Sequence, residues 1–311
     1  MKIGKTNTGV LISLIGIIAA TATLVLFYLF EPPTQILNEN DNTSIIDTEP
    51  IETDSSIPED KPDSIDLQPI IDEWASAIGG NRSVLIYDLD RDEVSASYDS
   101  TESYETASLY KLFVVYEGYR RLQNGEWDSD DSAGTTGHTI IECLDLAIRE
   151  SNSLCAETIW KMIGHDELDE IIRNDYGIIT SDISHLVSNP EDVAKMLQIY
   201  YKHEDITDQD LLSRMWDSFL NQPVTEYDWR QGLPSGFNTA TVYNKVGWEF
   251  NPDGRYWEIY HDAAIIEFPE SLDDMGNSIR PSRHLIVVVM TNHVPYQRIR
   301  ELGERIEAAI F

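Results

Sequence analysis

A serine and a lysine three positions apart are the residues of this chain best suited to chemistry. Ser108 and Lys111 lie in the otherwise apolar segment ETASLYKLFVVYEG. On a helix, positions i and i+3 share a face, so the hydroxyl and the amine would come within hydrogen-bonding reach. A serine is a weak nucleophile until a base takes its proton, and a buried lysine with a lowered pKa can be that base. The pair therefore predicts a serine nucleophile.

The same spacing also arises when a serine caps a helix and a lysine extends along an apolar surface to reach water. Two features of the sequence favour the catalytic interpretation. Ser-x-x-Lys occurs once in this lysine-poor chain, and its helix is too apolar to lie on a surface. A lysine in such a helix needs a specific role.

The elements that must position this pair follow the order helix, two strands, helical region, three strands, helix. Apolar spacing predicts helices over 69–80, 108–125, 139–149, 153–163, 190–203, 207–220 and 298–311. Strand signals predict strands over 83–90, 94–98, 240–248, 257–268 and 283–292. Strands joined by hairpins are antiparallel, and the terminal helices must cover one sheet face. We expect an α/β fold of the α+β kind: a five-stranded antiparallel sheet flanked by helices, with a helical lobe over about 126–225.

An uncharged apolar segment precedes this domain. Residues 9–30 contain 22 positions without a charge, which as a helix would span roughly 33 Å and cross a bilayer core of about 30 Å. Lys2 and Lys5 precede it, so the positive-inside rule predicts a single-pass anchor with everything after residue 30 extracytoplasmic. The alternative is a signal peptide cleaved at the A-x-A site of Ala20 and Ala22, which would leave an apolar new N-terminus.

Strong acidity marks the rest of the chain. Glu31 to Asp66 holds eleven acidic residues against Lys61, so residues 31–65 should form a disordered, self-repelling linker. The whole chain has 55 acidic and 22 basic residues and a net charge of −33. That charge would repel a nucleic-acid backbone, which excludes a nucleic-acid partner. The same acidity could be an adaptation to a salt-rich medium or a means of keeping the protein soluble, and the sequence leaves both open.

The cysteines and histidines do not predict a metal centre. Cys143 and Cys155 are the only cysteines, and HExxH and CxxC motifs are absent from the sequence. We expect no metal and no cofactor. The two thiols could form a disulfide outside the cytoplasm or remain as two buried thiols, and their spacing leaves both open.

Three segments together resemble a known family. YETASLYKLFVVYEG resembles the nucleophile helix of the penicillin-recognising serine enzymes, the class A β-lactamases and related D,D-peptidases. Their S-x-N motif corresponds to Ser151-Asn152-Ser153, and their K-T/S-G strand to Lys245-Val246-Gly247. The resemblance covers about residues 67–311. A competing register of the second motif would place Glu150 at the first position and Asn152 at the third.

The resemblance implies a role for each matched residue. Ser108 would be the acylated nucleophile, Lys111 its base, and Ser151 the proton relay beside Lys245, whose charge would attract a substrate carboxylate. The backbone N–H groups of Ser108 and Trp248 would form the oxyanion hole. The substrate-binding positions would be Ser153, Val246, Gly247 and Trp248, with the Trp248 side chain free to line the cleft.

The sequence also departs from the family pattern. Ser153 replaces an asparagine that contacts substrate, and Val246 replaces a hydroxyl residue. Segment 165–193 lacks the E-x-x-L-N signature whose glutamate activates the deacylating water, and its nearest acids are Asp182 and Glu191. We therefore expect slow turnover.

The resulting functional expectation is a membrane-anchored, monomeric serine hydrolase that forms an acyl-enzyme on β-lactams or cell-wall peptides. The alternative is a catalytically impaired surface binding module on the same fold. A Ser-His-Asp triad is disfavoured, because neighbouring strand residues such as His261 and Asp262 point to opposite faces. The segment Gly232–Gly236 also has the wrong spacing for a nucleophile elbow around Ser235.

Overall fold

The structure is a computed structural model that describes residues 62–224, 227–250, 258–273 and 275–310. The predicted membrane segment 9–30 and nearly all of the predicted linker lie outside these residues. Within the described ranges, none of the helices combines the length and the apolar character needed to span a bilayer.

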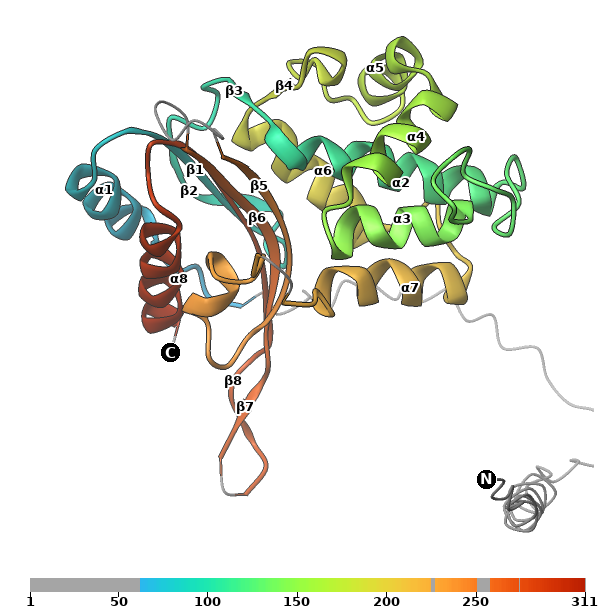
Figure 1. The fold of residues 1–311 in the computed structure, drawn as a ribbon. Coiled ribbons are helices and arrows are strands. Elements are labelled where there is room, and N and C mark those ends of the chain that lie inside the picture. Colours follow the sequence, from blue (N-terminus) through green and yellow to red (C-terminus); the bar gives the residue numbers. More distant parts are fainter. Residues whose placement is uncertain (1–61, 225–226, 251–257, 274, 311) are drawn as a thin grey trace, which may run out of the picture. The chain divides into compact units, whose positions relative to one another are not determined.

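Helices and strands follow the predicted order along the chain (Figure 1). The α-helices are α1 (Gln68–Ala77), α2 (Tyr110–Gln123), α3 (Ile140–Arg149), α4 (Ser153–Ile163), α5 (His165–Asn174), α6 (Pro190–Lys202), α7 (Gln209–Leu220) and α8 (Tyr296–Ile310). The strands are β1 (Asn81–Asp88), β2 (Glu93–Tyr98), β3 (Tyr104–Glu105), β4 (Val187–Ser188), β5 (Thr241–Phe250), β6 (Glu258–Phe268), β7 (Ser271–Leu272), β8 (Ser278–Arg280) and β9 (Arg283–Asn292). Short 3₁₀ helices are η1 (Ala107–Leu109), η2 (Ile183–His185) and η3 (Leu233–Gly236).

The predicted five-stranded antiparallel sheet is confirmed. Its strand order is β2-β1-β9-β6-β5, and each neighbouring pair is antiparallel. The β1–β2 hairpin turns at the predicted Asp90-Arg91-Asp92 segment, with Asp92 at φ 58°. Strand β5 is an edge strand, so one row of its backbone groups faces away from the sheet.

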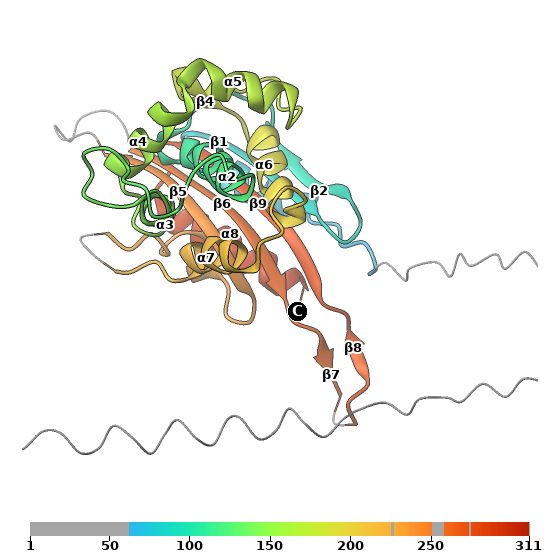
Figure 2. The same ribbon diagram turned by 90° about the vertical axis from the view of Figure 1, so that its right-hand side faces the viewer.

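Helices cover both faces of the sheet, as Figures 1 and 2 show. Helices α1 and α8 pack on one face, where Trp74 and Ile299 join the buried side chains of alternate strand residues such as Val84. Helices α2 and α6 pack on the other face, against the complementary set that includes Leu85 and Ala263. The period of two in each strand therefore divides the core into two layers.

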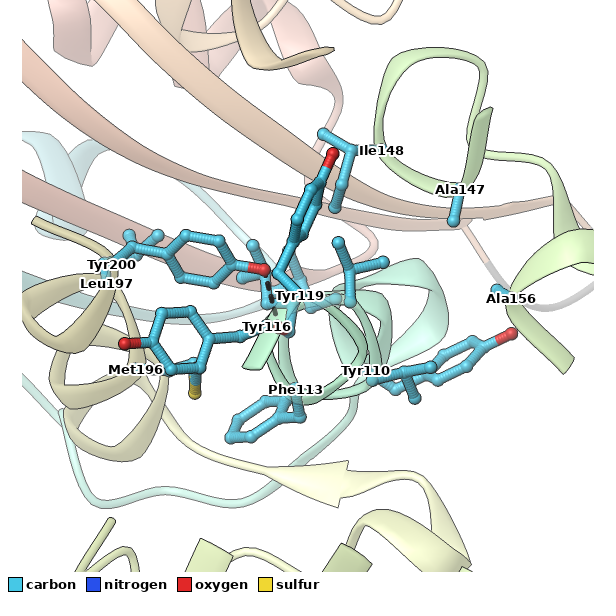
Figure 3. Packing of buried hydrophobic residues seen from close by; sticks show 14 of the residues in the cluster. Tyr110, Phe113, Tyr116, Tyr119, Ala147, Ile148, Ala156, Met196, Leu197 and Tyr200 are labelled. Atoms are coloured by element: carbon cyan, nitrogen blue, oxygen red, sulfur yellow. Dashed lines mark hydrogen bonds between the residues drawn. The ribbon is translucent and has the colours of Figure 1, made fainter. Parts of the chain in front are cut away.

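Helix α2 runs through the centre of the second layer. Ten of its residues, from Tyr110 to Tyr119, are buried, and Lys111 is one of them. Figure 3 shows side chains of α2, among them Tyr116 and Tyr119, packed together with Tyr200 of α6. The Tyr200 hydroxyl donates to the Leu112 carbonyl over 2.8 Å, which fixes α6 against α2. The apolar sequence after Ser108 is thus explained by burial of the first ten residues of α2.

Three features differ from the sequence prediction. Segment 165–193 contains a helix, α5, which buries Leu168 and Ile172 and carries acidic residues in its first turn. A two-stranded ladder of β3 and β4 ties residues 104–105 to this segment, and β7 and β8 form a hairpin beyond the main sheet. Ladders of two or three residues carry too little alternating pattern to be recognised from sequence.

Cys143 and Cys155 form a disulfide. The bond links α3 to α4 on either side of the loop that carries Ser151, and both cysteines are buried. The thiol pairing that the sequence left open is therefore present in the fold. A crosslink over this short separation restricts how far α4 can move from α3.

Candidate active site

Ser108 lies at the centre of the 3₁₀ turn η1, immediately before α2. It is half-buried, and the preceding residue, Ala107, has φ 43°. A left-handed conformation at a residue with a Cβ is strained and persists only where its surroundings impose it. Those surroundings include the Leu186 carbonyl, which accepts from the Thr106 N–H over 2.7 Å. The serine therefore sits on a sharply constrained turn.

The Lys111 amine comes from the first turn of α2, and Lys111 is 0% exposed. Its Nζ donates to the Ser151 carbonyl over 2.6 Å and contacts the hydroxyls of Ser151 and Ser153, each at 3.2 Å. Ser151 itself has φ 54°, so a second strained residue holds the loop that receives the amine. Lys111 thus joins α2 to the α3–α4 loop.

Lys245 reaches the same hydroxyl from the sheet. Its Nζ donates to Ser151 Oγ over 2.9 Å and to the Val246 carbonyl over 2.7 Å, and the residue is 1% exposed. Two amines from α2 and β5 therefore converge on one serine hydroxyl. A hydroxyl oxygen can accept from both and still donate its own hydrogen elsewhere.

Burial changes the protonation of both amines. It lowers the pKa of Lys111 to about 8, although the negative charge of Glu157 opposes the change. Burial, followed by the positive charge of Lys111, lowers the pKa of Lys245 well below its usual range, with Asp262 opposing. Two buried cations at one hydroxyl repel each other, so charging one amine favours the neutral form of the other.

One predicted contact is not formed. The hydroxyl of Ser108 makes no hydrogen bond to Lys111, nor to any other group in the described part of the chain, because the Lys111 amine is directed toward Ser151 and Ser153. Ser108 lies in a 3₁₀ turn and Lys111 in the α-helix that follows, so the expected i,i+3 geometry of a single α-helix does not apply. The structure brings together Lys111, Ser151, Ser153 and Lys245, and Ser108 lies in the turn before α2.

The second motif adopts the Ser151–Ser153 register in its contacts. Asn152 is the N-cap of α4, and its Oδ1 accepts from the Cys155 N–H over 3.0 Å. Glu150 lies 3.9 Å from Arg149 and is 39% exposed. Neither residue of the competing register is directed at the amines; the two flanking serines are.

Gly247 lets strand β5 lie directly against η1, the 3₁₀ turn that carries Ser108. A Cβ at this position would lie 2.6 Å from the Thr106 carbonyl oxygen and 2.9 Å from Leu109 Cγ. These distances are shorter than any real contact, and one partner is backbone, so only glycine fits without displacing the turn. The glycine of the third motif is explained by this close approach.

At the open edge of β5, which lies beside η1, alternate residues direct their backbone N–H and C=O groups away from β6. The carbonyls of Val242, Asn244 and Val246 accept from side chains of Arg230, Gln222 and Lys245, respectively. In an antiparallel pair, alternate residues direct both N–H and C=O toward the same side. By this alternation the Trp248 N–H also points to the open edge, as an oxyanion donor would require.

The side chains of Trp248 and Val246 do not line the site, which corrects the sequence prediction. Trp248 packs on the α8 face of the sheet, stacked on Tyr296 at 5.4 Å and edge-on to Tyr260 at 5.2 Å. Val246 is 1% exposed and lies opposite Asp262 in the register. Lys245 and Gly247 face the helical lobe, so strand alternation turns their neighbours away. Only backbone of these two residues is available to a substrate.

His261 and Asp262 lie on opposite faces, as predicted. The Thr291 N–H donates to His261 Nδ1 over 2.9 Å, so Nε2 carries the hydrogen and donates to the Glu105 carbonyl over 2.8 Å. Burial lowers the pKa of His261 to about 4, so the ring is neutral and holds the segment before Ser108 in place. On the other face, Asp262 accepts from the Leu233 N–H over 2.8 Å. No triad forms between them.

Asp182 and Glu191, the acids of segment 165–193 considered for deacylation, make other hydrogen bonds in the structure. The Asp182 side chain caps η2 and accepts from His185 Nδ1 over 2.8 Å. Glu191 Oε1 accepts from the Ser100 hydroxyl over 2.8 Å. Neither carboxylate is bonded to the lysines or to Ser151.

Comparison with known proteins decides the family. A profile described as the β-lactamase enzyme family matches residues 66–310, almost the whole described domain. The chain belongs to this family. It is therefore a serine hydrolase of the β-lactamase type, and the resemblance seen in its three motifs is confirmed. Among curated proteins, none matches its sequence.

Solved β-lactamases share the fold of this family member at low sequence identity. An ancestral class A β-lactamase superposes with a TM-score of 0.63 at 16% identity, covering 78% of this chain and 99% of that one. A β-lactamase from Xanthomonas campestris gives 0.63 at 13% identity, covering 78% and 98%. A halotolerant bacterial β-lactamase gives 0.60 at 17% identity, covering 77% and 98%.

Proposed function

We propose that this β-lactamase family member forms an acyl-enzyme on Ser108 and acts on β-lactams or cell-wall peptides. The observation that carries the proposal is the convergence of Lys111 and Lys245 on the Ser151 hydroxyl beside the nucleophile turn. Two fully buried amines at one hydroxyl are costly, and a structural role alone does not account for them. A base, a proton relay and a cation placed next to a serine account for all three groups.

In the proposed acylation, a proton is transferred from Ser108 to the leaving nitrogen through Lys111 and Ser151. Ser108 Oγ attacks the substrate carbonyl carbon, and its proton passes to neutral Lys111. Lys111 then returns a proton to Ser151 across the 3.2 Å contact as Ser151 donates its own to the leaving nitrogen. The backbone N–H groups of Ser108 and Trp248 would bind the oxyanion.

A negatively charged substrate would favour the neutral form of Lys111, the proposed base. A carboxylate placed beside Lys245 would offset the effect of burial and favour the charged amine. The charge on Lys245 would then repel a proton from Lys111, since both amines contact the same hydroxyl. A carboxylate-bearing substrate therefore promotes the neutral form of Lys111 that acylation requires.

An extracytoplasmic location fits this chemistry. The proposal of a single-pass anchor rests on the uncharged segment 9–30 behind Lys2 and Lys5. The Cys143–Cys155 disulfide supports it, because such bonds persist in oxidising compartments outside the cytoplasm. Cell-wall peptides and β-lactams are encountered there.

Burst kinetics test the proposed function. With a chromogenic cephalosporin we expect rapid release of about one product per enzyme, then a slow steady state limited by deacylation. The reason is that neither Asp182 nor Glu191 is placed to activate water near Lys111. Stopped-flow absorbance measures both phases. A fast linear rate without a burst would contradict the proposal of slow deacylation, and no product at all would favour a binding module.

Gly247→Ala tests the close approach of β5 to the nucleophile turn. The added methyl would displace the Thr106 carbonyl, so we expect acylation to slow by about tenfold or more, with a stability loss of about 1–3 kcal/mol. Acylation rates and thermal unfolding measure the two effects. Gly79→Ala is the matched control, because nothing lies within 4 Å of a Cβ there. A Gly247→Ala enzyme that acylates at the wild-type rate would show that the turn does not depend on this contact.

A further inference from the structure

One face of helix α4, which follows the Ser151 motif, lies against helix α2. Ser153, Glu157 and Trp160 follow one another at i, i+4 and i+7, the spacing of a single helix face. Ser153 at the start of this face bonds the Lys111 amine over 3.2 Å. Trp160 at its end packs against Tyr110 of α2, with ring centroids 5.1 Å apart. Glu157 therefore lies between two contacts with the nucleophile helix.

Tyr110 connects Glu157 to the lysine. Its hydroxyl donates to Glu157 Oε1 over 3.4 Å, and Lys111 Nζ lies 5.7 Å from the centre of its ring. The carboxylate and the amine thus contact the same tyrosine. In keeping with this geometry, Glu157 is the carboxylate whose charge acts on Lys111 and keeps its pKa from falling further.

Glu157 is also open to solvent. Its side chain is 40% exposed, and its nearest cation is Lys161, one turn further along the helix, at 4.0 Å. That pair is weak, since Lys161 is 68% exposed. A carboxylate that shares Tyr110 with the Lys111 amine and is accessible to water can take a proton from a water molecule that enters the site.

We propose that Glu157, on α4, is the general base that activates water for deacylation of Ser108. This inference rests on the proposed acyl-enzyme function. It places the base on the helix that follows the Ser151 motif, not in segment 165–193. Glu157 was not selected by sequence reasoning, although its i,i+4 spacing from Ser153 was visible.

The proposed step balances as follows. Water oxygen adds to the ester carbonyl carbon while its proton passes to the Glu157 carboxylate. The Glu157 proton then passes to the neutral Lys111 amine. As the bond from the carbonyl carbon to Ser108 Oγ breaks, the resulting Lys111 ammonium gives a proton to Oγ, and the product leaves as the free acid. Serine ends as the free hydroxyl, and lysine and glutamate end as the neutral amine and the carboxylate in which deacylation began.

Glu157→Gln is the direct test, with penicillin as the acylating probe and intact-mass spectrometry over time as the readout. We expect the lifetime of the adduct to increase by about 10²-fold or more, the usual contribution of a general base, while acylation stays within about threefold of wild type. Glu157→Asp, which keeps the carboxylate, should have an intermediate lifetime. Glu191→Gln and Lys161→Ala should both deacylate like the wild type.

Three results would overturn the assignment. An adduct lifetime unchanged in Glu157→Gln would show that the carboxylate takes no part in deacylation, as would a wild-type adduct that never turns over. Equal slowing of acylation and deacylation would assign Glu157 a structural role through Lys111. If the wild type forms no adduct, the acyl-enzyme function itself fails, and this outcome is distinct because it appears before any variant is compared.

Discussion

A Ser108→Ala variant should take no covalent label from a fluorescent penicillin, under conditions in which the wild type is labelled stoichiometrically. The reason is that the strained turn at Ala107 presents one hydroxyl beside the β5 edge, and alanine removes the atom that forms the ester. Fluorescence of the denatured protein on a gel measures the label. The expected loss is complete, because the other two serines beside the amines, Ser151 and Ser153, already accept hydrogen bonds from them.

Ser235→Ala is the matched control for this experiment. Ser235 belongs to the Gly232–Gly236 segment, the alternative nucleophile position in the sequence, and its hydroxyl donates to the Gln231 carbonyl over 2.6 Å. The control should label like the wild type. Labelling that survives in Ser108→Ala, or that disappears in Ser235→Ala, would assign the nucleophile elsewhere.

Lys111→Ala should slow acylation by about 10²- to 10⁴-fold, the range for loss of a general base. In the wild type, the pKa of Lys111 is lowered to about 8, so only roughly a tenth of the molecules carry the neutral amine at pH 7. The acylation rate should therefore rise about tenfold per pH unit below 8 and level off above it. The variant should lose this dependence.

Stopped-flow acylation between pH 6 and pH 10 measures both effects. Lys195→Ala is a suitable control, because Lys195 donates to the Gly177 carbonyl on the surface and should leave rate and pH profile unchanged. A Lys111→Ala enzyme that keeps the wild-type rise toward pH 8 would show that another group is the base.

Local patterns were sufficient to predict the sheet and its helices. The apolar segments at 83–90 and 283–292 became β1 and β9, because burial of both faces demands apolar residues along such strands. The apolar run after Ser108 became α2 for the same reason. Helix α5 was missed because its predominantly polar sequence, HDELDEIIRN, presents only a narrow apolar face.

The site was predictable in its residue types and less so in its contacts. Lys111 turns toward Ser151 because the strained loop offers a carbonyl and two hydroxyls, and no local pattern encodes a loop with φ 54° at a serine. The direction of Trp248, by contrast, could have been derived: with Lys245 and Gly247 facing the lobe, the strand period of two turns residue 248 to the other side.

The central claim is that Ser108 becomes an ester when this protein meets a β-lactam. Intact-mass spectrometry of the wild-type protein after incubation with benzylpenicillin, followed by peptide mapping, tests it most directly. We predict a mass increase equal to one opened penicillin, located on the peptide that contains Ser108. An unchanged mass at saturating penicillin, or an adduct on a peptide without Ser108, would contradict the account.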